Sequence, residues 1–283
     1  MAFGVDNIIT PRYSFFAVHL EPRDEEGIFF DDANTFEHLS QLITLANIYS
    51  IKITMQFTPH WIQEILKDEN KLNIVKEWER KGHEISAHHH GAQHNGIWDG
   101  YSNLPINRIM ELRTQAHPQR EPEKYHGNMD DYMVVLNKLV SPKTMCMGPD
   151  RDTDWPQQIP YSIEGMFNPS AGRPTEKIYN NNKVYELPFK YIGDQSAIEK
   201  AKVEYLESQA DESIGVVLHL REYVDNMDGV EGWFRFLKEI DPEAKYSKTA
   251  TWIIEQHFST GFPTWAIFLL VGAALFMLFG KKK

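Results

Sequence analysis

The chain has 283 residues, of which 42% are apolar and 24% are charged; this composition supports a full hydrophobic core and excludes a disordered protein. The formal net charge is −11 and no basic cluster precedes the last three residues, so nucleic acid is not expected as the main partner. The single cysteine, Cys146, excludes an intrachain disulfide and a zinc site built from several cysteines.

Strand-like and helix-like segments alternate along the chain. Apolar patterns predict strands over 14–22, 51–59, 83–90, 144–148 and 213–223. Helical periodicity predicts helices over 33–49, 104–117, 129–140, 196–212, 229–240 and 249–258, and one or two helices over 60–82. The repeated strand–helix order predicts a parallel α/β architecture, with a closed or partly closed (β/α) barrel as first choice and a doubly wound open sheet as second.

The last segment has the features of a membrane anchor. An uncharged run from Gly261 to Gly280, at about 1.5 Å rise per residue, is long enough to cross a hydrocarbon core of about 30 Å. Trp265 stands near one end of this run and three lysines close the other, as expected for the two interfaces of a bilayer. We therefore expect a folded domain over residues 1–258 and a single C-terminal transmembrane helix over residues 259–283.

The three terminal lysines predict the orientation of this anchor. The positive-inside rule places them in the cytoplasm and the folded domain outside it. An exported domain needs a signal, and the first residues contain no apolar core of a signal peptide. Two explanations stay open: a removed signal preceded the sequence as given, which we favour, or the protein is tail-anchored and faces the cytoplasm.

The most unusual stretch is rich in histidine. Within twelve positions it contains His83, His88, His89, His90 and His94. On the predicted strand, His88 and His90 point to one face and His89 to the other. Because His94 follows His90 by four residues, the two can bind one ion if the chain turns helical there. We therefore predict metal binding by His88, His90 and His94, and a structural role for His83 and His89.

Polar residues also stand at the ends of other predicted strands. His19 and Glu21 end the first strand, Asp150 and Arg151 follow the strand at 144–148, and His219 lies in the strand at 213–223. In both candidate architectures, active sites gather at the carboxyl ends of parallel strands. A carboxylate or histidine from the first strand would complete a three-ligand site, with zinc as the expected ion and the fourth position open for water.

The segment GHEISAHHHGAQH at 82–94 resembles the second motif of the polysaccharide deacetylase superfamily, the NodB-like carbohydrate esterases. In that family a Gly-His-Glu-Ile stretch leads to a His-x-x-x-His pair that binds zinc or another divalent ion. The spacing from Gly82 places His88 on the first ligand, but Ala92 stands at the partner position. The His-x-x-x-His spacing is met instead by His90 and His94, so which pair binds stays open.

The resemblance implies roles for further residues over about 14–258. Glu21 replaces one of the family's paired aspartates, as metal ligand or general base, and His19 adds a ligand. Asp150 is the second choice for the base, and His219 matches the family's histidine that assists the leaving group. Apart from the resemblance, Trp98, Asp99 and Tyr101 have two open interpretations: they line the substrate groove, since aromatic faces stack on sugar rings, or they anchor the loop on the barrel rim. Arg151 is also expected to bind substrate.

The leading hypothesis is a metal-dependent hydrolase that deacetylates an N-acetylated polysaccharide or surface glycan. The acidic net charge favours a neutral glycan over an anionic one. A second hypothesis is a non-catalytic, membrane-anchored protein that binds glycan or metal on the same barrel, because the paired aspartates are missing. A third is a different barrel metallohydrolase that acts on a small amide or phosphoester.

Overall fold

A computed structural model of the chain describes residues 12–21, 33–95, 97–116, 124–164, 171–209 and 212–259. Within these ranges ten strands form one sheet. The strands are β1 (Tyr13–Leu20), β2 (Ile53–Phe57), β3 (Glu84–His89), β4 (Thr144–Met147), β5 (Tyr161–Glu164), β6 (Ala171–Gly172), β7 (Thr175–Tyr179), β8 (Asn182–Pro188), β9 (Lys190–Tyr191) and β10 (Ser213–His219).

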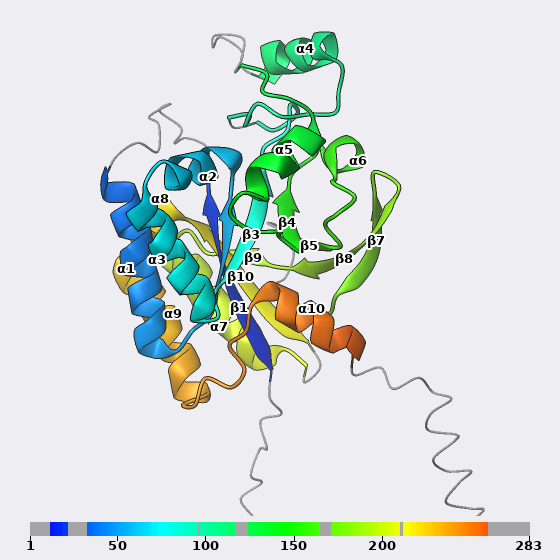
Figure 1. Cartoon of the computed structure of the whole chain (residues 1–283). Helices are drawn as coiled ribbons and strands as arrows, with labels where there is room; N and C mark the ends of the chain where they lie inside the picture. Colours follow the sequence, from blue (N-terminus) through cyan, green and yellow to red (C-terminus); the bar gives the residue numbers. More distant parts are fainter. Residues whose placement is uncertain are drawn as a thin grey trace, which may run out of the picture.

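The sheet is parallel through its centre and antiparallel at its edges. Its order is β6-β10-β1-β2-β3-β4-β5-β8-β7, and β9 also pairs with β10. The hairpin partner β7 runs antiparallel to β8, and the short β6 runs antiparallel to β10. β8 pairs with β5, and β9, which follows β8 directly in the chain, pairs with β10. Because β5 and β10 lie toward opposite sides of the sheet, these pairings show that the sheet curls and brings its two sides together. The curled, incompletely closed sheet agrees with the predicted (β/α) barrel (Figure 1).

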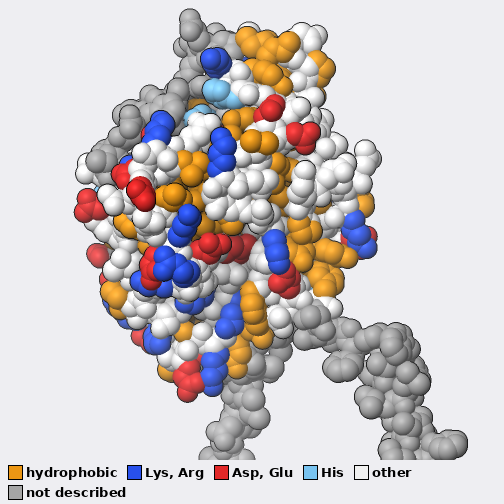
Figure 2. All heavy atoms as spheres, viewed as in Figure 1, with side chains coloured by type: hydrophobic (Ala, Val, Ile, Leu, Met, Phe, Trp, Pro, Cys, Tyr) orange, Lys and Arg blue, Asp and Glu red, His pale blue; other side chains and the backbone are white. Residues whose placement is uncertain are grey.

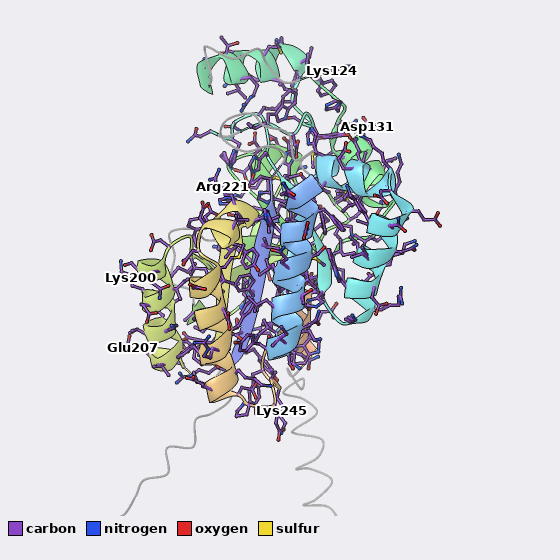
Figure 3. The ribbon with its side chains drawn as sticks, turned by 90° about the vertical axis from the view of Figure 1, so that its left-hand side faces the viewer. Lys124, Asp131, Lys200, Glu207, Arg221 and Lys245 are labelled. Atoms are coloured by element: carbon purple, nitrogen blue, oxygen red, sulfur yellow. The ribbon has the colours of Figure 1, made fainter. Side chains whose placement is uncertain are left out.

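Helices pack around this sheet. They are α1 (Ala33–Tyr49), α2 (Pro59–Leu66), α3 (Glu69–Arg80), α4 (Ile106–Ala116), α5 (Met129–Leu136), α6 (Arg151–Asp154), α7 (Gln195–Glu207), α8 (Leu220–Asp225), α9 (Met227–Ile240) and α10 (Ala250–Ser259). Figure 3 looks onto α1, α3, α7 and α9, with Arg221 toward one end of the barrel and Lys245 toward the other. On the face in Figure 2, basic side chains are interspersed with acidic ones.

The alternation of side chains along β1 explains how two cores form. Phe16, Val18 and Leu20 belong to the large core under the outer helices. Phe15 and Ala17 point the other way, into a smaller core inside the curled sheet. Both faces of β1 are therefore buried, as expected for a parallel strand inside a barrel.

The helix α10 lies inside the lower end of the curled sheet. Ala250, Ile253 and Ile254 are buried in the inner core, and the helix contacts β1, β5 and β8 (Figure 1). The inner core fills the amino-terminal end of the barrel with apolar side chains. The polar side chains that end the strands are left at the opposite end, which we call the carboxyl edge.

Several segment boundaries differ from the sequence prediction for local reasons. Of the one or two helices predicted over 60–82 the structure has two: α2 ends at Leu66, and Asp68 caps α3 by accepting bonds from the backbone N–H groups of Asn70 and Lys71. Gly82 follows with a φ of 89°, which confirms its expected role after the helix end. The strand predicted over 213–223 ends at His219, where α8 begins.

None of the helices in the described ranges is both long enough and apolar enough to cross a membrane. The anchor predicted over 259–283 lies outside the described residues, apart from Ser259 at the end of α10.

Candidate metal centre

Three strands bring a carboxylate and several imidazoles together at the carboxyl edge. β1 ends at Leu20 and carries His19, with Glu21 directly after it. β10 pairs with β1 in register, so that His219 stands beside His19. β3 contributes His88, and His90 follows the end of the strand. The histidines at the ends of the first, third and last parallel strands therefore meet, although they are distant in sequence.

The Glu21 carboxylate is the centre of the group. Its Oε2 lies 2.6 Å from Nε2 of His90, and its Oε1 lies 3.0 Å from Nε2 of His219 and 3.2 Å from Nε2 of His88. Burial alone would raise the pKa of Glu21, but the neighbouring His90, His88 and His219 outweigh it and hold that pKa well below its usual value. Glu21 is therefore ionised and surrounded by ring nitrogens.

The hydrogen bonds of His90 indicate that a proton or a metal ion lies between its Nε2, Glu21 and His88. Nδ1 of His90 lies 2.8 Å from the carbonyl oxygen of Ile97, so Nδ1 carries a proton and donates it. In the neutral ring, Nε2 is then a bare lone pair, yet it faces Glu21 Oε2 at 2.6 Å and His88 Nε2 at 3.0 Å. Facing acceptor atoms at these distances need a proton or a metal ion between them. The donor atoms of Glu21, His88 and His90 lie within 4.8 Å of one another, which fits a divalent cation.

His19 and His88 are neutral imidazoles, the form that binds metals. Their rings stack at 4.2 Å between centroids, with 28° between planes. Burial lowers the pKa of both, and the neighbouring His88 and His219 lower that of His19 further. His19 Nδ1 lies 3.8 Å from Glu21 Oε1, and His19, Glu21 and His219 form a second set of convergent donors.

His219 differs from the other histidines because it has acidic partners on both sides. Its Nδ1 lies 3.1 Å from Glu222 Oε1 and 3.0 Å from the Tyr191 hydroxyl, and its Nε2 faces Glu21. Burial lowers the pKa of His219, but the bonds to Glu21 and Glu222 outweigh it and raise the pKa to about 9. Glu222 is in turn fixed by the backbone N–H of His219, which donates to its Oε2 at 2.6 Å. His219 is therefore protonated at neutral pH and can donate a proton.

His94, predicted as a ligand, lies beside the donor group rather than in it. Its ring stacks on that of His90, with 3.8 Å between centroids and 22° between planes. Burial and the nearby His90 lower the pKa of His94 to about 2, and among the described residues it belongs to none of the convergent donor sets.

Asp150 and Arg151 are placed near the carboxyl edge but are bound to other groups. Both oxygens of Asp150 accept from the backbone N–H of Gln93, at 3.0 and 3.2 Å, and burial raises the pKa of this carboxyl. Arg151 donates to Glu164 at 3.3 Å and to the Tyr179 hydroxyl at 3.2 Å. Asp150 therefore holds the loop after β3, and Arg151 serves a neighbouring ion-pair network.

The residues expected to line a sugar groove support the loop from inside. Trp98 and Asp99 are fully buried, and Tyr101 is 4% exposed. The Trp98 indole donates to the carbonyl of Tyr101 at 2.7 Å, and Asp99 lies 2.9 Å from Nδ1 of His89. Side chains this deeply buried offer no ring face to a sugar, so of the two interpretations the burial favours the loop anchor over the groove contact.

Three residues with contacts in this region were not singled out from the sequence. Glu222 stands three residues after His219, a spacing typical of a capping box at a helix start. Tyr191 approaches from β9, which the sequence pattern did not resolve as a strand. Cys146 points inward from β4 and forms a donor set with His19 and His88, although a lone cysteine gave no metal signal in the sequence.

The fold and the donor cluster define a barrel with a candidate metal centre at its carboxyl edge, and this fold has solved relatives. A provisionally named polysaccharide deacetylase from Mycobacterium smegmatis superposes with a TM-score of 0.50 at 11% identity, covering 88% of this chain and 91% of its own. An allantoinase superposes with a TM-score of 0.54 at 11% identity, with the same coverage. A 4-alpha-glucanotransferase from Thermococcus litoralis gives 0.51 at 11% identity, but the match spans 89% of this chain and 41% of that one.

No family model and no curated protein sequence matches the chain. At 11% identity the structural likenesses concern the fold. They support a NodB-like fold, as the segment at 82–94 suggested.

Proposed function

We propose that the chain is a metal-dependent hydrolase of the deacetylase type. The observation that carries the proposal is the convergence of His90 Nε2, His88 Nε2 and the ionised Glu21 carboxylate in one buried site, with donor atoms within 4.8 Å of one another. The bond from Nδ1 of His90 to a backbone carbonyl is the usual way in which a metal-binding histidine is oriented. Two imidazole nitrogens and one carboxylate oxygen, from His88, His90 and Glu21, form a donor set that favours zinc among the common ions.

The proposed ligands are Glu21, His88 and His90, with His19 as an additional donor. When bound there, a divalent ion supplies Lewis-acid polarisation of an amide carbonyl and a water of lowered pKa. Glu21 Oε2 lies toward His90, whereas Oε1 lies toward His219 and His88, and Oε1 is the proposed acceptor of a proton from the attacking water. Asp150 remains the second choice for this base.

His219 is the proposed general acid. Its Nε2 lies 3.0 Å from Glu21 Oε1. His219 can therefore give its own proton to the departing amine and be reprotonated by the proton that Glu21 takes from water. Glu222 and the Tyr191 hydroxyl hold the other ring nitrogen and favour the protonated ring. Amide hydrolysis needs this proton, because an amine leaves readily only when it is protonated.

The proposed substrate is an N-acetylated polysaccharide or a related acetylated compound. The fold shared with a protein named as a polysaccharide deacetylase supports an acetylated glycan, and the allantoinase supports amide hydrolysis more broadly. The net charge of −11 favours a neutral polymer.

A second candidate is a non-catalytic protein that binds glycan or metal. The strand end His19-Leu20-Glu21 lacks the paired aspartates, and the expected groove residues Trp98 and Asp99 are buried. Binding of a metal without turnover of any acetylated oligosaccharide would favour this candidate.

His90→Ala is the first test, with the exposed His257→Ala as matched control. We expect about one zinc per chain and release of acetate from chitin oligosaccharides in the wild type and in the control, measured by elemental analysis and an acetate assay. His90→Ala should lose the metal and reduce turnover at least about a hundredfold. Acetate release that persists in metal-free His90→Ala would contradict the proposal.

A further inference from the structure

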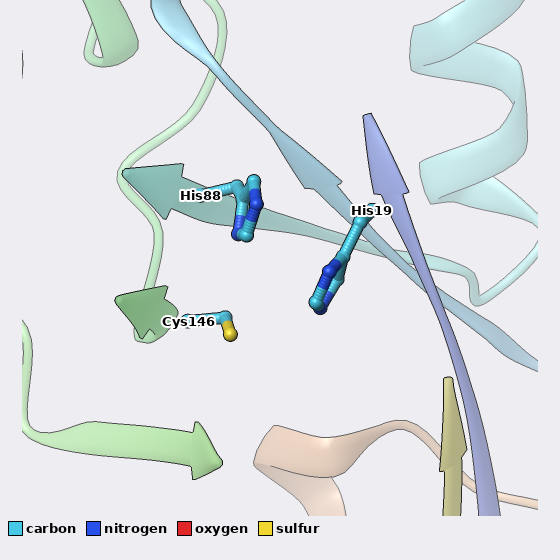
Figure 4. A group of neighbouring side chains, drawn as sticks. All are labelled: His19, His88 and Cys146. Atoms are coloured by element: carbon cyan, nitrogen blue, oxygen red, sulfur yellow. The ribbon is translucent and has the colours of Figure 1, made fainter. Parts of the chain in front are cut away.

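A second set of donors lies on the inner face of the barrel, on the Cys146 side of His88. It consists of His19, His88 and Cys146, whose donor atoms lie within 4.8 Å of one another. Figure 4 shows the three side chains directed from β1, β3 and β4 into the space between these strands. All three are at least nine-tenths buried, at 3%, 4% and 5% exposure.

The sheet register produces this arrangement. β3 and β4 are parallel neighbours, and their pairing sets His88 beside Cys146. Side-chain alternation points both inward, on the same face as His19 of β1. The set is therefore fixed by strands rather than by a loop, which is how rigid metal sites are held.

Two of these histidines have unpartnered nitrogens in the buried interior. His19 Nε2 and His88 Nδ1 have no hydrogen-bond partner among the residues that the structure describes. Gln56, fully buried and paired in register with His19, likewise has neither its amide nitrogen nor its amide oxygen bonded within the described part. Buried polar atoms without partners are rare and costly, so this layer is expected to hold something polar.

We propose that His19, His88 and Cys146 form a second metal site for a thiolate-binding divalent ion such as zinc or cobalt. This goes beyond the proposed hydrolase, in which Cys146 has no part. His88 then connects the two sites, because its Nε2 faces Glu21 and its buried Nδ1 has no hydrogen-bond partner among the described residues. Coordination by both rings requires the His19–His88 stack to open, since each lone pair lies in its ring plane.

The protons released on binding have defined origins and acceptors. Cys146 must lose its thiol proton to bind as a thiolate, and Glu164 Oε1 lies 3.7 Å from the Cys146 sulfur as the acceptor to which it donates. If both sites were filled, the neutral His88 ring would also have to give up its remaining ring proton, which would pass to solvent, so that both of its nitrogens could serve as ligands. The sulfur ligand selects zinc, cobalt or cadmium over magnesium and calcium.

Cobalt titration of the full chain tests the site, because thiolate–cobalt bonds give a charge-transfer absorption in the near ultraviolet. We expect the wild type to bind about two cobalt ions with this absorption, and Cys146→Ser to bind about one without it. His90→Ala should keep the absorption while losing the other ion.

Wild-type protein that binds cobalt with no thiolate absorption would overturn the second site and leave the hydrolase proposal intact. The reverse, absorption together with no metal-dependent hydrolysis, would support the second site and contradict the hydrolase. Circular dichroism of Cys146→Ser checks its fold. If that variant is unfolded, the wild-type and His90→Ala spectra still decide, because Cys146 is the single cysteine of the chain.

Discussion

The charge of a buried histidine in this protein is set by the atoms on its two ring nitrogens. His83 accepts the backbone N–H of Ile53 on Nδ1 at 3.1 Å, and its Nε2 lies 3.2 Å from the side-chain oxygen of Asn47. This arrangement is satisfied only by the neutral ring. Burial, with Lys52 and Lys81 nearby, lowers the pKa of His83 to about 4.

The lowered pKa of His83 predicts that the fold loses stability in acid. Its folded pKa lies below the unfolded value of 6.5, so between pH 6.5 and 4 the unfolded chain binds more protons and acidification favours unfolding. In the wild type, His83 should account for roughly 3 kcal/mol of the unfolding free energy that is lost between pH 7 and pH 4. His83→Gln should lose less free energy over this range by that amount. Urea unfolding of His83→Gln at both pH values, with His257→Gln as control, measures it. An unchanged pH dependence in His83→Gln would show that the buried ring is protonated in the fold.

At the scale of elements, one buried charge holds β3, the loop after it and α6 together. His89 lies between Asp99 at 2.9 Å and Asp154 at 3.4 Å. Burial lowers the pKa of His89, but the two carboxylates outweigh it and raise the pKa to about 10. Asp99 also accepts from the backbone N–H of His90 at 3.2 Å, so the ion pair helps to place a proposed metal ligand.

Asp99→Ala should therefore destabilise the fold strongly, because it leaves a buried charge with one partner fewer. We expect a loss of about 3–5 kcal/mol in unfolding free energy, measured by chemical denaturation at pH 7. Asp130→Ala, at an exposed position in the first turn of α5, should change stability by less than about 1 kcal/mol. Equal effects of the two substitutions would argue against an ionised His89.

The elements also show which features of the fold and the candidate site could be predicted from the sequence alone. Apolar periodicity is a local property, so the alternation of strands and helices was predictable, and with it the strand-end positions of His19, Glu21, His88 and His219. The stacking of His94 on His90 was not, because the direction of a loop side chain depends on tertiary packing. Cys146 was missed because alternation gives its face, while only the pairing of β3 with β4 makes His88 its neighbour.

At the scale of the whole molecule, α10 closes the end of the barrel opposite the metal centre. Its buried Ile254 packs in the inner core with Phe15 and Ala17 of β1. Ile254→Ala should cost about 2–5 kcal/mol, from the lost apolar burial and the cavity left behind. The outward-facing Val134 on α5, 60% exposed, is the control, and Val134→Ala should have an effect within about 0.5 kcal/mol. Thermal or chemical unfolding compares them; a small effect of Ile254→Ala would mean that α10 contributes little to the core.

The membrane anchor stays a prediction from the sequence. Leu270 lies in the middle of the uncharged run, where an arginine costs about 2.5–3.5 kcal/mol on membrane insertion. The full chain should float with phospholipid vesicles in a density gradient, and Leu270→Arg should do so less. Arginine at Lys282, which keeps the charge, is the matched control. No flotation of the wild type would remove the predicted anchor.

The pairing of β1 with β10 has a consequence for how the protein is made. Glu21 and His19 come from near the start of the chain, whereas His219 comes from near its end, and β1 lies inside the sheet with β2 on its other side. On the ribosome, β1 must wait with one edge unpaired until most of the polypeptide has emerged. Contacts this distant in sequence also slow folding. The full constellation around Glu21 can therefore assemble only late in synthesis, so a nascent or prematurely terminated chain is expected to carry the histidine-rich strand without a complete reactive centre.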